Sequence, residues 1–468
     1  MAEQQTHLKR SLGLWAVVGL GLGYMTPTVV FDTFGIVSNI TNGVVPFTYL
    51  VALAVMLFTA ISYGKMVRVF PSAGSAYVYT KETMHPGLGF MVGWTALLDY
   101  LLLPLVNAVI IRIYMVSMFP EIPAWIWVSV YVAAITGINV LSMGKTSKAN
   151  MILLIYEVVL IGVFIALAWV KLSQGLGAGT IFTTRPLFHA SVEMSAVFAG
   201  ATIVAFSFIG FDAITMYAEE AVDEKTVPRA IVLTVFIGGA IFFVGGYFAQ
   251  AAFPTIEGFQ NYDDTLPELA LYIGGKLFMF IFISGAFAAT CASGLASHSS
   301  VARLLYVMGR NGVLPKKMFG YVHPRYQTPA FNVILVGVVS LLAMGPSLEL
   351  VASVINFGAL IAFTFVNLSV IAHFAFKNKQ YHTPGQIFHY IILPLIGAGM
   401  TGILWAYLSL DALVGGVAWF LIGLLYLAFI TGFFRKPVPN MDTEEELSGH
   451  HGAHADVAPA TGEGLGAR

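Results

Sequence analysis

The chain has 468 residues, of which 58% are hydrophobic and only 10% are charged, and its formal net charge is -1. Soluble domains carry about 25% charged residues, so this composition excludes a soluble core and predicts a polytopic helical membrane protein. No basic stripe of the kind that binds nucleic acid is present. The single cysteine, Cys291, excludes an intramolecular disulfide framework.

Twelve apolar segments follow one another along the chain, and about 20 mostly apolar residues are enough to cross a bilayer. The segments run approximately over 13–36, 44–64, 88–111, 122–142, 149–171, 195–218, 230–253, 275–301, 328–345, 348–376, 387–408 and 412–434. We therefore predict an all-α fold of twelve transmembrane helices. Its parts would be a cytoplasmic N-terminus over 1–12, a transmembrane domain over 13–436 and a disordered cytoplasmic tail over 437–468.

The basic residues orient the predicted bundle. With the N-terminus in the cytoplasm, all of the 23 Lys and Arg residues fall on the cytoplasmic side except Arg112, Lys171, Arg185 and Lys276. Cytoplasmic loops carry an excess of Lys and Arg. This bias predicts that both termini lie in the cytoplasm.

The sixth segment carries a carboxylate near mid-membrane depth. Asp212 stands two residues after Gly210, in the run Phe206-Ser207-Phe208-Ile209-Gly210-Phe211-Asp212. An ionised carboxylate there costs at least about 2.5 kcal/mol unless it faces a cavity, a partner or a substrate. Because glycine favours a break in the helix, the pattern is typical of the discontinuous helices at transporter binding sites. The alternative is a kinked helix with a protonated or locally bonded aspartate.

The first segment shows a second candidate break. Its glycines, ending at Gly23, are followed by Tyr24-Met25-Thr26-Pro27, and proline suits the first turn of a new half-helix. The Gly-x-Gly-x-Gly spacing is not a nucleotide loop, since no strand precedes it. Interruptions in the first and sixth segments, five segments apart, predict two inverted repeats.

Three further acids lie inside the predicted helices, namely Asp32, Asp99 and Glu157, with no base at matching depth. Carboxylates at this depth require protons, cations or polar neighbours. Tyr24, Tyr100 and Phe208 adjoin the proposed breaks or acids, and an aromatic face stabilises a desolvated ammonium by about 2 kcal/mol. Lipid-facing or packing roles remain the alternative for most of the aromatic residues.

Motifs in three loops resemble those of the amino acid–polyamine–organocation transporters. They are RVFPSAGSAY over 68–77, Ala218-Glu219-Glu220 with VPRAI over 227–231, and SVARLLYVMGR over 300–310 followed by Leu314-Pro315. The resemblance covers nearly all of residues 9–436. It implies a LeuT-like fold, in which two inverted five-helix repeats are followed by two C-terminal helices, and uptake driven by a proton or sodium gradient.

Within that family the chain looks most like bacterial putrescine importers, which implies a multi-pass protein of the bacterial inner membrane. The supporting stretches include Tyr24–Pro27, Leu98-Asp99-Tyr100 and Ile355-Asn356-Phe357-Gly358-Ala359-Leu360. Two departures matter. Bulky Tyr24-Met25-Thr26 stands where amino-acid transporters have a small, glycine-rich break, and Glu157 stands where many relatives have a lysine. The first departure suits a diamine. In the second, the glutamate can carry a proton or contact an ammonium group, and the alternative is a structural glutamate bonded to a neighbouring helix.

We therefore predict an importer of putrescine or a related small cationic amine, coupled to protons rather than sodium. Membrane lipid and the amine are the expected partners, and we expect no cofactor, metal or nucleic acid. The predicted substrate-binding residues are Tyr24, Thr26, Asp99, Tyr100, Ser207, Phe208 and Asp212, and Glu157 is the predicted proton-coupling residue. The alternatives are a proton-coupled amino-acid transporter of the same fold, an intramembrane enzyme, for which no metal or catalytic motif appears, and a sensor without transport.

Overall fold

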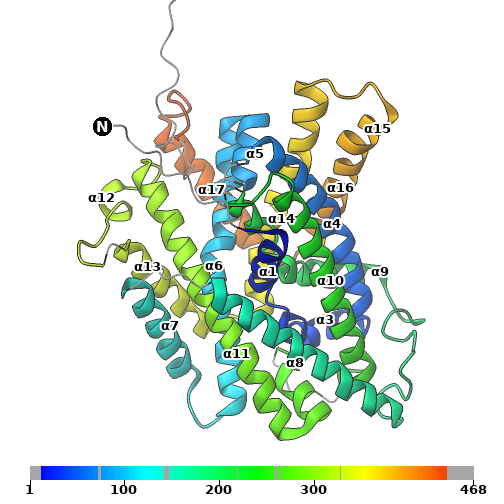
Figure 1. Cartoon of the computed structure of the whole chain (residues 1–468). Coiled ribbons are helices and arrows are strands. Elements are labelled where there is room, and N and C mark those ends of the chain that lie inside the picture. The colour runs from blue at the N-terminus through cyan, green and yellow to red at the C-terminus, as the bar shows by residue number, and fades with distance from the viewer. Residues whose placement is uncertain are drawn as a thin grey trace, which may run out of the picture.

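The computed structural model is an all-helical bundle (Figure 1). It describes residues 12–71, 75–141, 147–218, 220–257, 259, 262–263, 265–326 and 328–439. Residues 1–11 and 440–468, which contain almost all of the predicted N-terminal segment and most of the predicted tail, lie outside the described part. Glu219 and residues 72–74 of two loop motifs also lie outside it.

Eleven of the described helical segments are long and apolar enough to span a membrane, and the helix over Ala330–Met344 is a shorter twelfth. This confirms the expected polytopic helical architecture. The ninth predicted segment, 328–345, is the short one, because α13 (Ala330–Ser340) ends in the 3-10 turn η3 (Leu341–Met344).

The first half of the chain supplies spans 1 to 5. Span 1 comprises α1 (Leu14–Met25) and α2 (Val29–Asp32), and α3 (Phe34–Thr41) follows it. Span 2 is α4 (Val45–Val69), and after the short α5 (Ser75–Thr83) come span 3, α6 (Pro86–Met118), span 4, α7 (Ala124–Leu141), and span 5, α8 (Ser147–Ser173).

The second half supplies spans 6 to 12. Span 6 comprises α9 (Met194–Val204), η1 (Ala205–Phe208) and η2 (Asp212–Tyr217), and span 7 is α10 (Thr226–Ala252). Span 8 is the part of α11 (Thr265–Arg310) that follows a kink at Gly275, and α12 (Lys316–Phe319) leads to span 9, which is α13 with η3. Span 10 is α14 (Leu348–Val370) with η4 (Ile371–Lys377), span 11 is α15 (Pro384–Ile387), η5 (Phe388–Ile392) and α16 (Leu393–Ala406), and span 12 is α17 (Leu410–Ile430).

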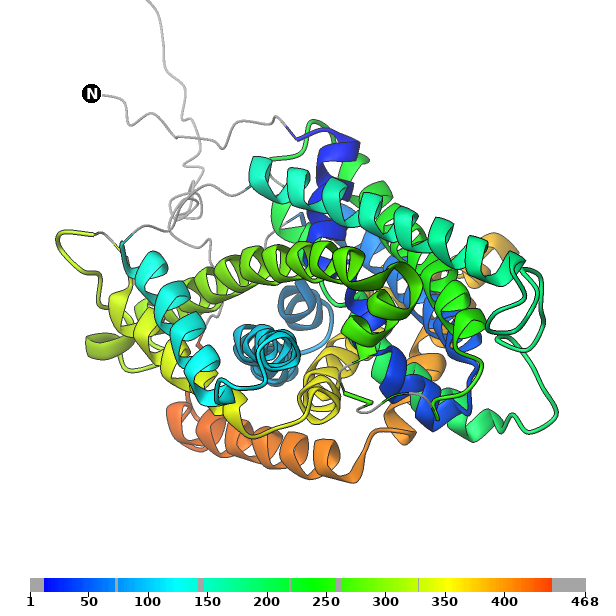
Figure 2. The same cartoon turned by 90° about the horizontal axis from the view of Figure 1, so that it is seen from below.

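The long helix α6 lies at the centre of the bundle. Seen from below, it appears end on, with α11 passing along one side and α17 along the other (Figure 2). The end of the bundle that holds α5 and α12 is called here the α5 end (top of Figure 1). Backbone hydrogen bonds from Leu12 N to Glu220 O (3.0 Å) and from Val222 N to Leu12 O (3.1 Å) join the start of span 1 to the end of span 6.

Candidate functional site

Span 6 loses its helical backbone immediately before Asp212. The 3-10 turn η1 ends at Phe208, Ile209 is extended, and Gly210 has a φ of 116°. A Cβ atom on Gly210 would stand 2.8 Å from the Cβ of Tyr24, so glycine allows both the left-handed backbone and the close approach of spans 1 and 6. The Gly210 N–H donates to Asp212 Oδ1 at 3.2 Å. The predicted break in span 6 is thus confirmed, and it fixes the Asp212 carboxylate.

Span 1 is interrupted at the corresponding place. Its first helix ends at Met25, Thr26 has a φ of 48°, and helical structure resumes at Val29. Tyr24 lies in the last turn of the first half-helix and reaches across to span 8, where its hydroxyl lies 3.4 Å from Ser300 Oγ. Both predicted interruptions therefore face one another in the middle of the bundle.

A cavity of about 280 Å³, called here the main cavity, extends from these breaks toward the α5 end. Spans 2, 3, 6, 8 and 10 and helix α5 contribute to its wall. Its polar, charged and aromatic lining comprises Tyr63, Ser75, Tyr77, Asp99, Tyr100, Asp212, Ser300, Arg303 and Phe363.

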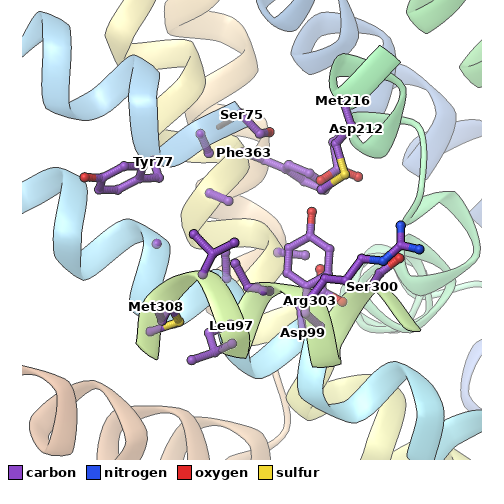
Figure 3. A pocket seen from close by; sticks show the side chains of 18 of the residues that line it. Ser75, Tyr77, Leu97, Asp99, Asp212, Met216, Ser300, Arg303, Met308 and Phe363 are labelled. Atoms are coloured by element: carbon purple, nitrogen blue, oxygen red, sulfur yellow. The ribbon is translucent and has the colours of Figure 1, made fainter. Parts of the chain in front are cut away.

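Two carboxylates enter the main cavity from different walls. Asp212 extends from span 6 and Asp99 from span 3, with Ser300 and Arg303 of span 8 beside Asp99 (Figure 3). Asp99 is 5% exposed, and its Oδ1 has no hydrogen-bond partner among the described residues. A buried, unsatisfied carboxylate oxygen is costly. The arrangement is therefore suited to a ligand that brings positive charge and hydrogen-bond donors.

Aromatic side chains form part of the wall of the main cavity. Tyr63 and Phe363 are both buried and lie 6.1 Å apart between ring centroids, and Tyr100 follows Asp99 directly on span 3. Phe211 of the span 6 break packs edge-on against Tyr63 at 5.5 Å. Aromatic faces attract cations through the ring quadrupole, most strongly in a desolvated site.

Arg303 is the basic residue in the lining of the main cavity. Its side chain is exposed. Among the described residues the ion pair found is that between Lys81 and Glu82, at 3.6 Å. No carboxylate of these residues therefore lies within 4.0 Å of the Arg303 guanidinium. The guanidinium therefore shares the main cavity with both acids without neutralising either one in a close pair.

A second, smaller cavity of about 30 Å³, called here the minor cavity, lies on the other side of the breaks. Its polar lining comprises Tyr24, Thr26, Thr28, Asp32, Asn107, Thr290 and Ser293. Asp32 is 7% exposed and accepts a hydrogen bond from the hydroxyl of Tyr114 at 2.8 Å.

The predicted binding residues divide between three places. Asp99, Tyr100 and Asp212 line the main cavity, whereas Tyr24 and Thr26 line the minor cavity. Ser207 and Phe208 line neither cavity.

Ser207 packs against span 2 and Phe208 against span 7 instead. The Tyr49 hydroxyl lies 3.0 Å from Ser207 Oγ and 3.0 Å from Thr33 Oγ1, and Phe208 packs edge-on against Phe242 at 5.3 Å. Tyr49 thereby joins residues next to both breaks to one rigid helix, which holds the interrupted segments in position.

Glu157 of α8 also lies away from both cavities. It is 3% exposed, and its Oε2 has no hydrogen-bond partner among the described residues. The backbone of Thr28 in the span 1 break and the carboxylate of Asp32 lie close enough to act on it electrostatically. Glu157 thus lies near the break in span 1 rather than in the wall of either cavity.

Tyr63, Arg303 and Phe363 are not among the residues predicted from the sequence, although the main cavity brings them to the two acids. A signal for span 8 was present, because Ser300, Arg303 and Val307 recur at helical spacing and share one face. Tyr63 and Phe363 stand in uniformly apolar helices, where nothing in the sequence separates a cavity wall from ordinary packing. In the described part of the chain no group of three or more His, Cys, Asp or Glu side chains could hold a metal ion.

Comparisons with known proteins agree with this architecture. Residues 12–447 match the amino acid permease family. The chain belongs to this family, within the amino acid–polyamine–organocation superfamily. The permease is 46% identical over 439 residues to the low-affinity putrescine importer PlaP of Escherichia coli strain K12, which covers 94% of this chain and 97% of PlaP. It is 25% identical to the branched-chain amino acid permease BcaP of Bacillus subtilis strain 168, over 89% of this chain and 92% of BcaP.

The permease also shares its fold with a solved transporter structure. The crystal structure of MhsT in complex with L-phenylalanine superposes with a TM-score of 0.61 and 17% sequence identity, covering 86% of this chain and all of that chain. At this identity the likeness shows the fold alone. It confirms the LeuT-like architecture expected from the two interrupted spans, and the family identifies the chain as a multi-pass transporter rather than an enzyme.

Proposed function

We propose that the permease is a secondary active importer of putrescine or a related small cationic polyamine. The observation that carries the proposal is the presence of Asp99 and Asp212 on different walls of one cavity, with no basic side chain of the described residues in a close ion pair with either acid. A diamine carries two ammonium groups, so each carboxylate can contact one of them. The 46% identity to a protein named as a putrescine importer supports the same substrate.

The permease is proposed to lie in a bacterial inner membrane, with both termini in the cytoplasm. It rests on the excess of Lys and Arg in the loops at the α5 end, including Arg68, Lys81 and Arg310. In this orientation the main cavity opens toward the cytoplasm, which corresponds to the state that releases an imported substrate.

Each predicted residue has a proposed role. Asp212 and Asp99 contact the ammonium groups, and Tyr100 shapes the wall beside Asp99. Tyr24, Thr26, Ser207 and Phe208 set the geometry of the two breaks. Glu157 carries the coupling proton, and no cofactor takes part.

An amino acid is the second candidate substrate, and Arg303 is the observation that favours it. A guanidinium in the main cavity could pair with a substrate carboxylate in a bidentate contact. Against it stand the two carboxylates of the cavity, which would repel the same group.

Uptake of labelled putrescine into proteoliposomes that contain the full-length protein tests the proposal. We expect accumulation under an imposed inward proton gradient, competition by other diamines, and weak competition by neutral or acidic amino acids. Accumulation driven by sodium alone would contradict proton coupling. Uptake of amino acids without transport of diamines would show that an amino acid is the substrate.

A further inference from the structure

The connection between spans 8 and 9 carries positive charge and no negative charge. It comprises residues 311–329 and is called here the α12 loop. Lys316, Lys317 and Arg325 are exposed on it, and no Asp or Glu occurs in the loop or in the two spans that it joins. Within the described part of the chain none of the three cations is held in an ion pair. Their charges are therefore available to an anion outside the protein.

The helix α12 is fixed to the bundle through Phe319. Its ring packs edge-on against Phe331 of span 9, with 5.5 Å between ring centroids, and its carbonyl accepts a hydrogen bond from the side-chain amide of Asn332 at 2.9 Å. Gly309 near the end of span 8 allows the close approach, since a Cβ atom there would stand 2.5 Å from the Cβ of Phe319. The backbone that carries the two exposed lysines is thus held against both spans.

The rest of the α12 loop is folded around His323. Its Nδ1 accepts hydrogen bonds from the backbone N–H groups of Arg325 at 3.3 Å and Tyr326 at 3.4 Å. Its own N–H donates to the carbonyl of Thr328 at 2.9 Å, and its ring stacks on Tyr326 with 4.8 Å between ring centroids. Because these contacts fix the backbone around Arg325, a ligand of this surface need not order the loop when it binds.

Apolar side chains are exposed between the cations. They are Met318, Tyr321 and Val322. In both views the α12 loop lies at the margin of the bundle, beside the ends of α11 and α13 (Figures 1 and 2). An excess of Lys and Arg at this end is explained by topology alone, but the exposed apolar side chains are not. Cations interleaved with apolar and aromatic side chains are typical of segments that lie at the surface of a membrane.

We infer that the α12 loop is a binding surface for anionic phospholipid headgroups of the leaflet at the α5 end. The three cations contact the headgroup phosphates, and the three exposed apolar side chains enter the boundary between headgroups and acyl chains. Each Lys or Arg near a negatively charged membrane surface strengthens binding by about fivefold. The inference depends on where the loop lies and is independent of the substrate of the permease.

The test measures lipid binding by the full-length protein in detergent. Native mass spectrometry gives the Kd of phosphatidylglycerol and of phosphatidylcholine with the same acyl chains. We expect the wild type to bind phosphatidylglycerol at least about tenfold more tightly. The substitution Lys316→Gln/Lys317→Gln/Arg325→Gln should reduce this preference more than about fivefold. Lys316→Arg/Lys317→Arg/Arg325→Lys keeps the charges and should keep the preference.

The matched control is Lys225→Gln/Lys377→Gln/Lys379→Gln. It removes three exposed basic residues from the loops that precede α10 and follow η4, and it should leave the preference within about twofold of the wild type. An equal loss in this control would assign the preference to net charge and overturn the inference. An unchanged preference after substitution in the α12 loop, or equal binding of both lipids by the wild type, would also overturn it.

Two further measurements use an intact α12 loop. Raising the ionic strength should weaken the preference of the wild type, because salt screens exposed charges, and a preference that does not respond to salt would contradict the inference. The acids of the C-terminal tail are the other candidate occupant. Asp442→Asn/Glu444→Gln/Glu445→Gln/Glu446→Gln should leave the Kd of phosphatidylglycerol unchanged. Binding that becomes more than about fivefold tighter would show that the tail occupies the surface in place of lipid.

Discussion

Asp99 and Asp212 come from different spans, and the difference in their hydrogen bonding predicts different roles. Asp212 is held by the Gly210 N–H in the broken segment, whereas Asp99 Oδ1 has no partner among the described residues. Asp212→Asn should lower kcat/KM for putrescine uptake more than about 30-fold, since removing a buried charge partner costs about 2–5 kcal/mol. Initial rates of uptake in proteoliposomes measure this loss.

Asp99→Asn should harm a diamine far more than a monoamine of similar length, because only the diamine brings a second ammonium group. Asp411→Asn, the same change at an exposed acid in the first turn of α17, is the control and should transport normally. Near-normal affinity for putrescine in Asp212→Asn, or equal losses for both amines in Asp99→Asn, would contradict the assignment.

Arg303 allows the two candidate substrates to be separated by one substitution. Its positive charge shares the main cavity with both acids, so for a diamine it is repulsive and Arg303→Gln should lower the KM by up to about fivefold, or about 1 kcal/mol. For an amino acid the guanidinium would bind the carboxylate, and the same substitution should abolish transport. Arg303→Lys keeps the charge and is the control. Competition curves with putrescine and with amino acids give the readout.

The sequence predicted the acidic residues of the site better than its walls. Asp99 and Asp212 could be selected because a charge inside an apolar helix has few explanations. Tyr63 and Phe363 could not, because an aromatic residue in a membrane helix is equally compatible with lipid, packing and a cavity. Ser207 and Phe208 adjoin the predicted break, yet the Ser207 side chain turns toward Tyr49 of α4 and the Phe208 ring packs against Phe242 of α10. The direction of a side chain in a non-helical segment cannot be derived from spacing.

At the scale of the elements, the interrupted spans depend on contacts from their neighbours. The amide of Asn356 on α14 donates to the carbonyl of Thr202 at 2.7 Å, and this carbonyl lies in the last turn of α9, where the break leaves acceptors without a helical partner. Gly358, two residues further along α14, allows α14 to approach α6 so closely that a Cβ atom would stand 2.5 Å from the Thr95 carbonyl oxygen. This contact places α14 directly behind Asp99.

Gly210 provides a test of the break in span 6. Gly210→Ala should lower uptake more than tenfold, because a side chain there is strained at positive φ by about 1–3 kcal/mol and its Cβ would press on Tyr24. Gly23→Ala is the matched control, since a Cβ atom on Gly23 of α1 meets nothing within 4 Å, and it should transport normally. Uptake is compared at equal amounts of inserted protein. Normal uptake by Gly210→Ala would show that the left-handed backbone at this position is dispensable.

The arrangement of elements was largely predictable, because hydropathy and the positions of Gly210 and Pro27 report directly on spans and breaks. The length of span 9 could not be predicted, because its apolar run continues past Leu341, where the α-helix tightens into a 3-10 turn. The depth of the two cavities relative to the breaks could not be predicted from the sequence either, because it depends on how three spans from both halves of the chain pack together.

At the scale of the whole molecule, coupling requires that a proton and the substrate favour the same change of conformation. Glu157 lies apart from the lining of the main cavity, so direct contact with a substrate there does not link the two. Its carboxylate instead lies near the backbone of Thr28, within the break that separates α1 from α2. Protonation of Glu157 would weaken the electrostatic attraction between this carboxylate and the backbone of span 1, which also carries Tyr24 and Asp32. The break in span 1 is therefore the element through which proton and amine would act on each other.

Glu157→Gln tests this link, because glutamine keeps the size of the side chain and mimics the neutral form. The variant should still catalyse exchange of labelled for unlabelled putrescine, since the main cavity is intact. It should lose accumulation driven by a pH gradient, and its uptake should no longer depend on pH. Glu121→Gln, at an exposed position between α6 and α7, is the control and should accumulate putrescine as the wild type does. Counterflow and gradient-driven uptake in the same proteoliposomes separate the two activities. If Glu157→Gln still concentrates putrescine with unchanged pH dependence, the coupling proton resides elsewhere, and Asp32, whose charge acts on Glu157, becomes the next residue to test.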